Sequence, residues 1–304
     1  MSVITVSHLH KSYGKVQALR DISFEVRDRE VFGVVGPDGA GKSTLFNILT
    51  TLLLPDSGTA TVLGQDVREG YLEIRKHIGY LPGTFSLYPD LTVEENLVFF
   101  ATMYQSSIQE NMPLIEPIWM QISPFKNRPA GKLSGGMKQK LALCCALIHK
   151  PVLLFLDEPT TGVDPVSRKE FWEILASIKQ QGISVVVSTP YMDEATLCDR
   201  IALLQEGRFI QMDTPQNIVQ EFRGHLVTMT TRDTFRLLKL MPDCPIDCTF
   251  YPYGENFHVI FYDDLAQILP VFKSFLQKNG IIYNSLIEIQ PTIEDCFIEI
   301  VKGR

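Results

Sequence analysis

A glycine-rich peptide contains the residues of this chain that are best suited to holding the phosphates of a nucleotide. Its sequence, GPDGAGKST, fits the pattern G-x-x-x-x-G-K-[ST], with a strand-like run at Val31–Val35 before it and a helical run after it. Glycines let backbone N–H groups wrap around phosphate oxygens, Lys42 neutralises the β- and γ-phosphates, and the Ser43 hydroxyl ligates Mg²⁺. The predicted phosphate-binding residues are Gly36, Pro37, Asp38, Gly39, Ala40, Gly41, Lys42, Ser43 and Thr44.

An apolar run that ends in two carboxylates, Leu153–Pro159 (LLFLDEP), supplies the second half of this chemistry. In magnesium-dependent phosphoryl transfer, one carboxylate places the metal and another orients the attacking water. We therefore predict that Asp157 joins Ser43 as a metal ligand, and that Glu158 and Lys42 are the catalytic residues. A glycine-rich turn that binds nothing is the alternative, and the downstream carboxylates argue against it.

A third peptide, Leu133–Gln139 (LSGGMKQ), is typical of a helix start. Ser134 is a good N-cap residue, Gly135 and Gly136 leave backbone N–H groups uncovered, and an apolar helix follows. Uncovered N–H groups and the helix dipole both attract anions. The peptide therefore predicts a second anion-binding element.

Taken in order, these motifs resemble those of ATP-binding cassette (ABC) subunits, the nucleotide-hydrolysing parts of ABC transporters, over roughly residues 3–222. Leu133–Gln139 resembles the signature segment peculiar to that family, and Thr161–Asp164 resembles the loop that crosses its dimer interface. The resemblance implies ATP and Mg²⁺ as ligands, with Tyr13 stacked on adenine. It also implies that the signature residues serve the nucleotide of a second ABC ATPase subunit. The nucleotide-binding residues added by the resemblance are Tyr13, Ser134, Gly135, Gly136 and Asp164.

Two positions depart from the pattern of the family, where it touches the γ-phosphate or the attacking water. Gly83 stands where the family usually has Gln, and Pro190 stands where it usually has His. Since losing one transition-state contact typically costs about a hundredfold in rate, we expect ATP binding with slow turnover here and a non-identical partner that supplies the fast site. The alternative is that Thr84, Thr189 or a water molecule makes the missing contact, and that the site hydrolyses ATP at a normal rate. Asp38, where the family more often has Asn, is expected to point outward.

The rest of the sequence predicts an α/β fold with a P-loop nucleotide-binding core at residues 1–223. Polar and apolar residues alternate on either side of the phosphate loop, as in antiparallel strands. From Val152 onward, strand-like and helical runs alternate, which favours a largely parallel sheet. Thr92 and Glu95 form a capping box that begins a mainly helical subdomain at about residues 92–150, in which Pro113 and Pro117 are expected at helix starts or kinks.

Residues 224–304 have no phosphate motif and predict a small C-terminal α+β domain. The expected elements are strands at 226–230, on both sides of 253–256 and at 281–288, with helices at 234–240, 265–278 and 293–301. This tail resembles that of ABC-2 type exporter ATPases and ends in a similar segment, Pro291–Phe297 (PTIEDCF). The resemblance favours an exporter, and a generic dimer-stabilising appendage is the alternative.

The composition of the chain bears on its number of domains and on its contact with a membrane. With 304 residues, of which 45% are hydrophobic and 21% charged, it has the composition of a soluble globular protein with about two domains. No apolar run approaches the roughly 18 residues that span a bilayer, and the first residues do not form a secretion signal. We therefore expect a peripheral protein at the cytoplasmic face of the membrane, held there by an integral-membrane permease.

The net charge and the cysteines bear on whether the chain binds nucleic acid or zinc. The net charge of -7 argues against nucleic acid, because nucleic-acid-binding domains usually carry a basic stripe. The six cysteines are expected to be reduced thiols, and Cys244 with Cys248 lacks the second Cys/His pair of a zinc site. A soluble ABC-family ATPase acting on ribosomes or DNA is the alternative function, although the chain has one cassette and no long heptad run. A small-molecule kinase is a third hypothesis, which the signature segment disfavours.

Overall fold

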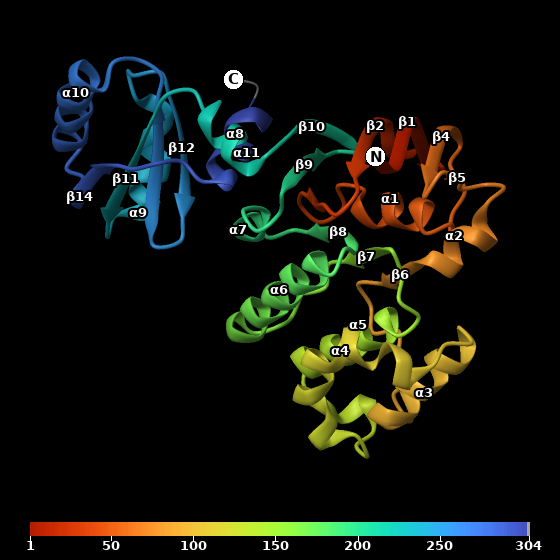
Figure 1. Ribbon diagram of the computed structural model, residues 1–304. Coiled ribbons are helices and arrows are strands. Elements are labelled where there is room, and N and C mark those ends of the chain that lie inside the picture. The colour runs from red at the N-terminus through yellow and green to blue at the C-terminus, as the bar shows by residue number, and fades with distance from the viewer. Residues whose placement is uncertain (303–304) are drawn as a thin grey trace. The chain divides into compact units, whose positions relative to one another are not determined.

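The computed structural model describes residues 1–302 of the chain (Figure 1). The chain divides into two compact units, Met1–Pro215 and a second that begins at Gln216. The predicted domain boundary, between residues 223 and 224, lies a few residues past this division. Each unit has an apolar cluster of its own.

A six-stranded sheet forms the centre of the first unit, in the order β10-β9-β3-β8-β7-β6. Every residue of β3, β8 and β7, three neighbouring strands inside the sheet, is buried, which is typical of parallel strands covered on both faces. The parallel pairing that the sequence predicts is therefore confirmed for most of this sheet; only β10 runs antiparallel to its neighbour β9. The strands are β3 (Val31–Val35), β6 (Ile78–Leu81), β7 (Leu153–Asp157), β8 (Ser184–Thr189), β9 (Arg200–Gln205) and β10 (Arg208–Asp213).

A second, antiparallel sheet with the order β2-β1-β4-β5 flanks the phosphate loop in sequence. Ile22, Phe24 and Val26 alternate along β2 and are buried in the same apolar cluster as Leu45 and Phe46 of helix α1 (Lys42–Leu49). The alternation in the sequence predicts this sheet correctly because one of its faces is buried. Its strands are β1 (Ser2–Tyr13), β2 (Val16–Arg27), β4 (Ser57–Val62) and β5 (Gln65–Asp66).

The predicted helical segment contains α3 (Val93–Met103), α4 (Ile108–Ile122) and α5 (Gly135–Leu147), which lie together below the sheet in Figure 1. Two short 3₁₀ turns, Ser123–Phe125 and Ala130–Lys132, connect α4 to α5. The capping box forms as predicted: the Glu95 N–H donates to Thr92 Oγ1 at 3.2 Å, and the Thr92 N–H donates to the Glu95 carboxylate at 2.8 Å. The other helices along the first unit are α2 (Tyr71–His77), α6 (Pro165–Gln180) and α7 (Met192–Ala195), and α8 (Pro215–Gln220) crosses the division between the units.

Helix α4 contains the two prolines that the sequence predicts at helix starts or kinks. The structure places Pro113 and Pro117 inside this single helix rather than at a helix start. They are four residues apart, so the two missing N–H groups lie on one side of the helix, where both side chains are exposed. Ile115, Ile118 and Ile122 are almost fully buried on the other side. Tertiary packing therefore outweighs the two lost backbone hydrogen bonds.

The second unit is an antiparallel sheet in the order β12-β13-β11-β14 with three helices. Leu237 of α9 and Phe272 of α10 are buried in one apolar cluster with Val259 of the sheet. The bounds of all three helices agree with the sequence prediction, and β14 begins slightly later than predicted. The elements are β11 (His225–Thr231), α9 (Thr234–Leu240), β12 (Cys248–Tyr253), β13 (Asn256–Phe261), α10 (Leu265–Lys278), β14 (Tyr283–Glu288) and α11 (Ile293–Val301), with a 3₁₀ turn at Met241–Asp243.

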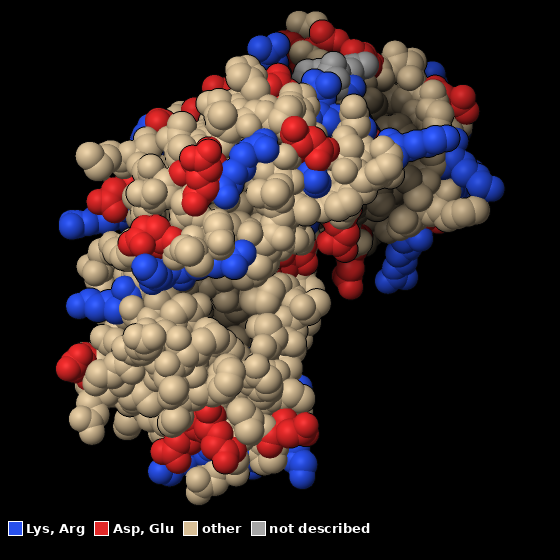
Figure 2. Space-filling model, turned by 90° about the vertical axis from the view of Figure 1, so that its right-hand side faces the viewer, with Lys and Arg blue, Asp and Glu red and all other residues tan. Residues whose placement is uncertain are grey.

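Two features of the described residues concern membranes and surface charge. Among residues 1–302, no helix is both long and apolar enough to cross a bilayer. On the face shown in Figure 2, blue and red side chains both occur over the upper part, while much of the lower part is uncharged.

Candidate functional site

The carboxyl ends of strands β3, β7 and β8 meet at one edge of the central sheet. The phosphate loop and Asp157, which the sequence predicts to bind phosphate and metal, lie at this edge. Val35, the last residue of β3, pairs with Thr189, and Asp157, the last residue of β7, pairs with Ser188. The phosphate loop leaves β3 at Gly36 and enters α1 at Lys42. Open parallel sheets bind ligands at this edge, because loops from neighbouring strands converge on it.

The phosphate loop is shaped by close backbone packing. Gly41 is the N-cap residue of α1 with φ of 113°, and a Cβ atom there would lie 2.4 Å from the carbonyl oxygen of Ala18, so only glycine fits. Lys42 is 3% exposed, and its Nζ donates to the carbonyl oxygens of Gly36 at 2.8 Å and Pro37 at 3.0 Å. The ammonium group is thus held inside the loop, where it faces the uncovered N–H groups of the α1 start.

Asp157 and Ser43 lie together at the start of α1, and both supply oxygen atoms. Asp157 is buried, and Ser188 Oγ donates to its Oδ1 at 2.5 Å. Burial raises the pKa of Asp157, while hydrogen bonds from Ser188 and Ser43 oppose the rise. In nucleotide sites, Mg²⁺ is bound by oxygen atoms of the protein, such as those of a hydroxyl and a carboxylate, together with phosphate oxygens. The residues present therefore fit this metal.

Glu158 follows Asp157 in a left-handed backbone conformation, with φ of 49°. Its N–H donates to the Ser188 carbonyl at 3.1 Å and to Ser188 Oγ at 3.0 Å, and these bonds hold the unusual turn. The turn aims the carboxylate at the phosphate loop, where Glu158 Oε1 lies 3.0 Å from Lys42 Nζ. The two predicted catalytic residues are therefore in contact across the site.

A cavity of about 400 Å³ opens beside this pair. Predicted residues that line it are Tyr13, Gly39, Gly41, Lys42, Ser43, Thr44 and Glu158. Sequence reasoning missed its other wall, which comes from β2 and the β9–β10 turn: Val16, Gln17, Ala18, Arg20, Glu206 and Gly207. Long-range backbone bonds place this turn here, from the Arg20 N–H to the Gly207 carbonyl at 2.7 Å and from the Gly207 N–H to the Ala40 carbonyl at 2.9 Å, so no local signal identifies it. Tyr13 is half exposed at the end of β1, and Asp38 is 90% exposed at the side chain, pointing outward as expected.

The signature segment lies elsewhere in the unit. Ser134 caps α5 by accepting from the Met137 N–H at 3.4 Å. A Cβ atom on Gly136 would lie 2.8 Å from Ser167 Oγ at the start of α6, so the signature packs against the end of the Thr161–Asp164 loop. Asp164 is the N-cap of α6 and accepts from the Ser167 N–H at 3.0 Å. None of Ser134, Gly135, Gly136 and Asp164 lines the cavity at the phosphate loop.

The two positions that depart from the family pattern flank the carboxylate pair. A Cβ atom on Gly83, just after β6, would lie 3.1 Å from the carbonyl oxygen of Asp157. Pro190 directly follows Thr189, the residue that pairs with the end of β3. Gly83 therefore lies against the Asp157–Glu158 pair, and Pro190 follows the end of the strand that pairs with β3.

A buried carboxylate that sequence reasoning missed joins three elements next to Pro190. Glu194 is 2% exposed, and it accepts from Thr189 Oγ1 at 2.5 Å and from Thr160 Oγ1 at 2.7 Å. Arg168 of α6 donates to the same carboxylate at 3.1 Å and to Asp193 at 3.2 Å. Glu194 therefore fixes the end of β8 to the loop after Glu158. Its position four residues after a proline gives no sign of this role in the sequence.

We expect Glu194→Gln to lower the ATPase rate about tenfold and to leave ATP affinity within about twofold, because small displacements of reacting groups cost rate more than binding. The measurement is steady-state phosphate release against ATP concentration. Asp193→Asn is the matched control, since Asp193 pairs with the same Arg168 but its side chain is 76% exposed. Equal rates for the wild type and the Glu194 variant would contradict the positioning role.

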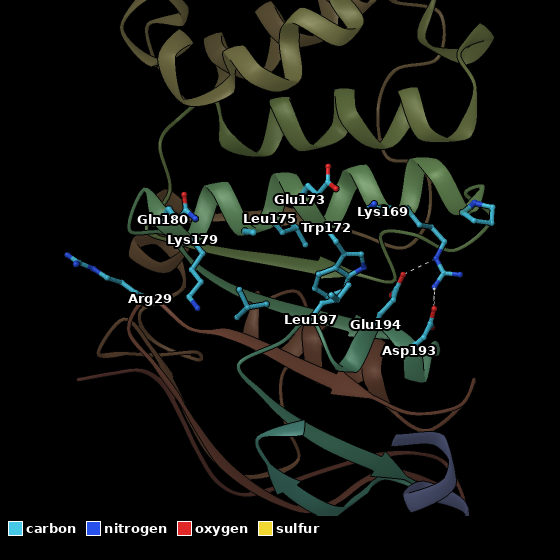
Figure 3. A pocket seen from close by; sticks show the side chains of 14 residues that line it. Arg29, Lys169, Trp172, Glu173, Leu175, Lys179, Gln180, Asp193, Glu194 and Leu197 are labelled. Carbon is cyan, nitrogen blue, oxygen red and sulfur yellow. Dashed lines mark hydrogen bonds and ion pairs between the residues drawn. The ribbon is translucent and has the colours of Figure 1, made fainter. Parts of the chain in front are cut away.

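A larger cavity, of about 710 Å³, borders the same carboxylate from the other side (Figure 3). Trp172 of α6 and Leu197, just after α7, lie side by side in it, and the dashed lines in Figure 3 mark the bonds of Arg168 to Asp193 and Glu194. None of the predicted phosphate-site residues lines this cavity. The described residues that line it and those that line the cavity at the phosphate loop are two separate sets.

Comparison with known proteins agrees with this geometry. Residues 19–161 match the family model described as "ABC transporter". The chain is 42% identical over 221 residues to the probable multidrug ABC transporter ATP-binding protein YbhF of Escherichia coli, which covers 71% of this chain but only 38% of YbhF. It is also 37% identical over 230 residues to the Nod factor export ATP-binding protein I of Burkholderia orbicola, covering 74% of this chain and 75% of that protein.

Solved structures with similar folds belong to the same group. The structure of cbiO1 from Clostridium perfringens, part of the ABC transporter complex cbiONQ, superposes with a TM-score of 0.65 at 27% identity, covering 72% of this chain and 91% of that one. A dimeric post-hydrolysis state of the ATP-binding cassette MJ0796 with ADP and Pi gives a TM-score of 0.63 at 25% identity, covering 69% and 98%. With the phosphate loop, the carboxylate strand and the signature segment in one fold, the chain belongs to the family of ABC transporter ATP-binding proteins.

Proposed function

We propose that this chain is the ATP-binding and ATP-hydrolysing subunit that powers an ABC transporter, and that the transporter is an ABC-2 type exporter. The observation that carries the first part is the meeting of Lys42, Ser43, Asp157 and Glu158 at one cavity. Mg²⁺ bound at these residues would supply positive charge that stabilises the phosphates during transfer. Ser43 and Asp157 would hold the ion, Lys42 would bind the phosphates, and Glu158 would orient the attacking water.

The names of two relatives support the exporter assignment. YbhF is described as a probable multidrug transporter protein, and the Burkholderia protein as a Nod factor export protein. The chain spans only 38% of the length of YbhF, so the partners and cargo of that protein are carried over here as part of the proposal. The chain would work at the cytoplasmic face of the membrane, held by a permease.

The permease would dock on the helical segment. Val98, Phe99 and Met103 of α3 are 38% to 52% exposed, and Phe99 packs edge-on against Tyr88, which is 47% exposed. An exposed group of large apolar side chains is a typical protein-binding surface. In Figure 2 the lower part of the molecule, to which α3 belongs, shows a broad uncharged area.

The signature segment supports a dimer with a second ABC ATPase subunit. Ser134 and Gly136 lie away from the cavity at the phosphate loop of this chain, and their N–H groups begin helix α5. An exposed helix N-terminus binds phosphate oxygens. These residues would therefore contact the nucleotide of the partner, and the phosphate loop here would receive the signature of the partner.

We further propose that the dimer is asymmetric, because Gly83 and Pro190 supply no side chain that can contact the γ-phosphate or the attacking water. This chain would bind ATP with slow turnover, and a non-identical partner would supply the fast site. A purified chain that hydrolyses ATP briskly by itself, in a manner that Ser134→Ala abolishes, would contradict the asymmetry.

We expect the double variant Gly83→Gln with Pro190→His to raise the ATPase rate of the purified chain at least about tenfold, since each side chain restores a transition-state contact. Steady-state phosphate release measures the change. Gly83→Ala is a control for crowding alone, because its Cβ would lie 3.1 Å from the Asp157 carbonyl. Adding Glu158→Gln to the double variant should return the rate to its starting level. No gain in rate would mean that other groups already fill these positions.

A further inference from the structure

Two of the six cysteines differ from the rest in exposure. Cys244 and Cys248 are partly exposed. The other four, Cys144, Cys145, Cys198 and Cys296, are buried, and burial raises the pKa of each of these thiols. A buried thiol with a raised pKa is inert because the thiolate is the reactive form. Reactivity is therefore concentrated at Cys244 and Cys248.

The backbone brings these two cysteines together. Cys244 follows the Met241–Asp243 turn, and its N–H donates to the Met241 carbonyl at 3.0 Å. The chain then bends at Pro245 and Ile246 before β12 begins at Cys248. The side chains of Cys244, Ile246 and Cys248 all pack against the edge of the apolar cluster of the second unit, while those between them are exposed. The bend therefore places both sulfur atoms on the same side of the loop.

The two thiols form a hydrogen bond, and this contact lowers the pKa of Cys244 to about 7. Lys302 adds positive charge nearby, since its ammonium interacts electrostatically with Cys248 and donates to the Phe250 carbonyl at 3.3 Å. A thiolate at neutral pH next to a second thiol is the arrangement of an attacking and a resolving cysteine. In the described residues, no third Cys, His, Asp or Glu side chain joins them to make a metal site.

We propose that Cys244 and Cys248 are a redox-modification site, at which hydrogen peroxide converts the two thiols into a disulfide within the chain. The Cys244 thiolate attacks one peroxide oxygen, the O–O bond breaks, and hydroxide leaves, so that Cys244 becomes a sulfenic acid. The Cys248 sulfur then attacks the Cys244 sulfur, the S–O bond breaks, and the hydroxyl leaves with the thiol proton as water. Two thiols are oxidised and one peroxide is reduced to two waters.

The disulfide would join the Met241–Asp243 turn to the start of β12, which is an edge strand of its sheet. Closing so short a loop restrains the unfolded chain only modestly. It demands little movement of the folded chain, because a hydrogen bond already joins the two side chains. The disulfide is thus a local covalent modification of the second unit, and a thiol reductant reverses it.

The test uses the whole reduced chain, folded, in a chelator-containing buffer at neutral pH. After exposure to a small excess of hydrogen peroxide, the chain is denatured, its free thiols are alkylated with iodoacetamide, and its peptides are analysed by mass spectrometry. We expect the peptide with both cysteines to carry no alkyl group and to have lost two hydrogen atoms, and dithiothreitol to restore alkylation at both. Before oxidation, Cys244 should be alkylated at least about tenfold faster than Cys198 in the folded chain.

Two variants separate the roles of the sulfurs. Cys248→Ser should leave Cys244 as a sulfenic acid that dimedone traps, whereas Cys198→Ser should leave disulfide formation unchanged. The main result is measured on the wild-type chain, so misfolding of a variant cannot by itself support or contradict the proposal. Full alkylation of both cysteines after peroxide, or a disulfide that joins two chains instead of one, would overturn the proposal.

Discussion

Replacing Lys42 with methionine should weaken the binding of magnesium-ATP at least about a hundredfold, because a buried ammonium inside the phosphate loop is worth several kcal/mol to an anionic ligand. Lys42 is 3% exposed and contacts both the loop carbonyls and Glu158, so its ammonium group is held at the phosphate loop. Titration with a fluorescent ATP analogue in the presence of Mg²⁺ measures the dissociation constant. Circular dichroism and thermal unfolding check that the variant is folded.

Lys140→Met is the matched control for this variant. The Lys140 side chain is 11% exposed and pairs with Glu170 at 2.6 Å, away from the cavity at the phosphate loop. It removes a largely buried positive charge of the same kind without touching the nucleotide site, so ATP affinity should stay within about twofold. Equal losses in the two variants would point to a general effect of charge or folding. The phosphate-loop interpretation would then fail.

Replacing Asp295 with alanine should destabilise the second unit by about 3 kcal/mol, because removing one partner of a buried, charged hydrogen-bond group leaves the others unpaired. Asp295 is 0% exposed at the start of α11. Its Oδ1 lies 2.6 Å from the Tyr251 hydroxyl and 2.7 Å from His258 Nδ1, and its Oδ2 accepts from the Thr292 N–H at 2.7 Å. Urea unfolding followed by hydrogen exchange of α11 peptides measures the change. Tyr251→Phe, which removes one donor, should cost only about 1 kcal/mol, and similar losses for both would contradict this account.

The same carboxylate gives the second unit a pH dependence of known sign. Burial raises the pKa of Asp295, but hydrogen bonds from Thr292, Tyr251 and His258 outweigh burial and hold the pKa below the ordinary 3.8. A carboxyl group whose pKa is lower in the folded state stabilises the fold above its unfolded pKa and loses that contribution as pH falls through the folded value. The stability difference between the wild type and Asp295→Ala should therefore shrink below about pH 3.8.

The segment around Asp295 shows what the sequence can predict. The motif Pro291–Phe297 marks a resemblance and a helix start, and the helix forms with the predicted bounds. The partners Tyr251 and His258 are about forty residues away and lie on two different strands. Local pattern finds the bounds of the helix, because they depend on adjacent residues. It cannot find the buried network, because that depends on the register of the sheet.

The nucleotide site likewise contains residues that the sequence predicts and residues that it does not. Gly36–Thr44, Asp157 and Glu158 are found from spacing, since the loop and the strand end each carry their chemistry within a few residues. Ser188 bonds Asp157 and Glu158, and Glu194 bonds Thr189 and Thr160. Both are ordinary polar residues in sequence, and their partners come from other parts of the chain that the pairing of β8 with β7 brings close. The two prolines of α4 are a case where local rules favour a helix start and three buried isoleucines favour a continuous helix.

The separate apolar clusters of the two units have a consequence for the history of this protein. Its curated relatives align over 221 to 230 residues, close to the length of the first unit, which ends at Pro215. The two clusters share no residue. Each set of core residues can therefore accumulate substitutions during evolution without a change in the residues of the other set.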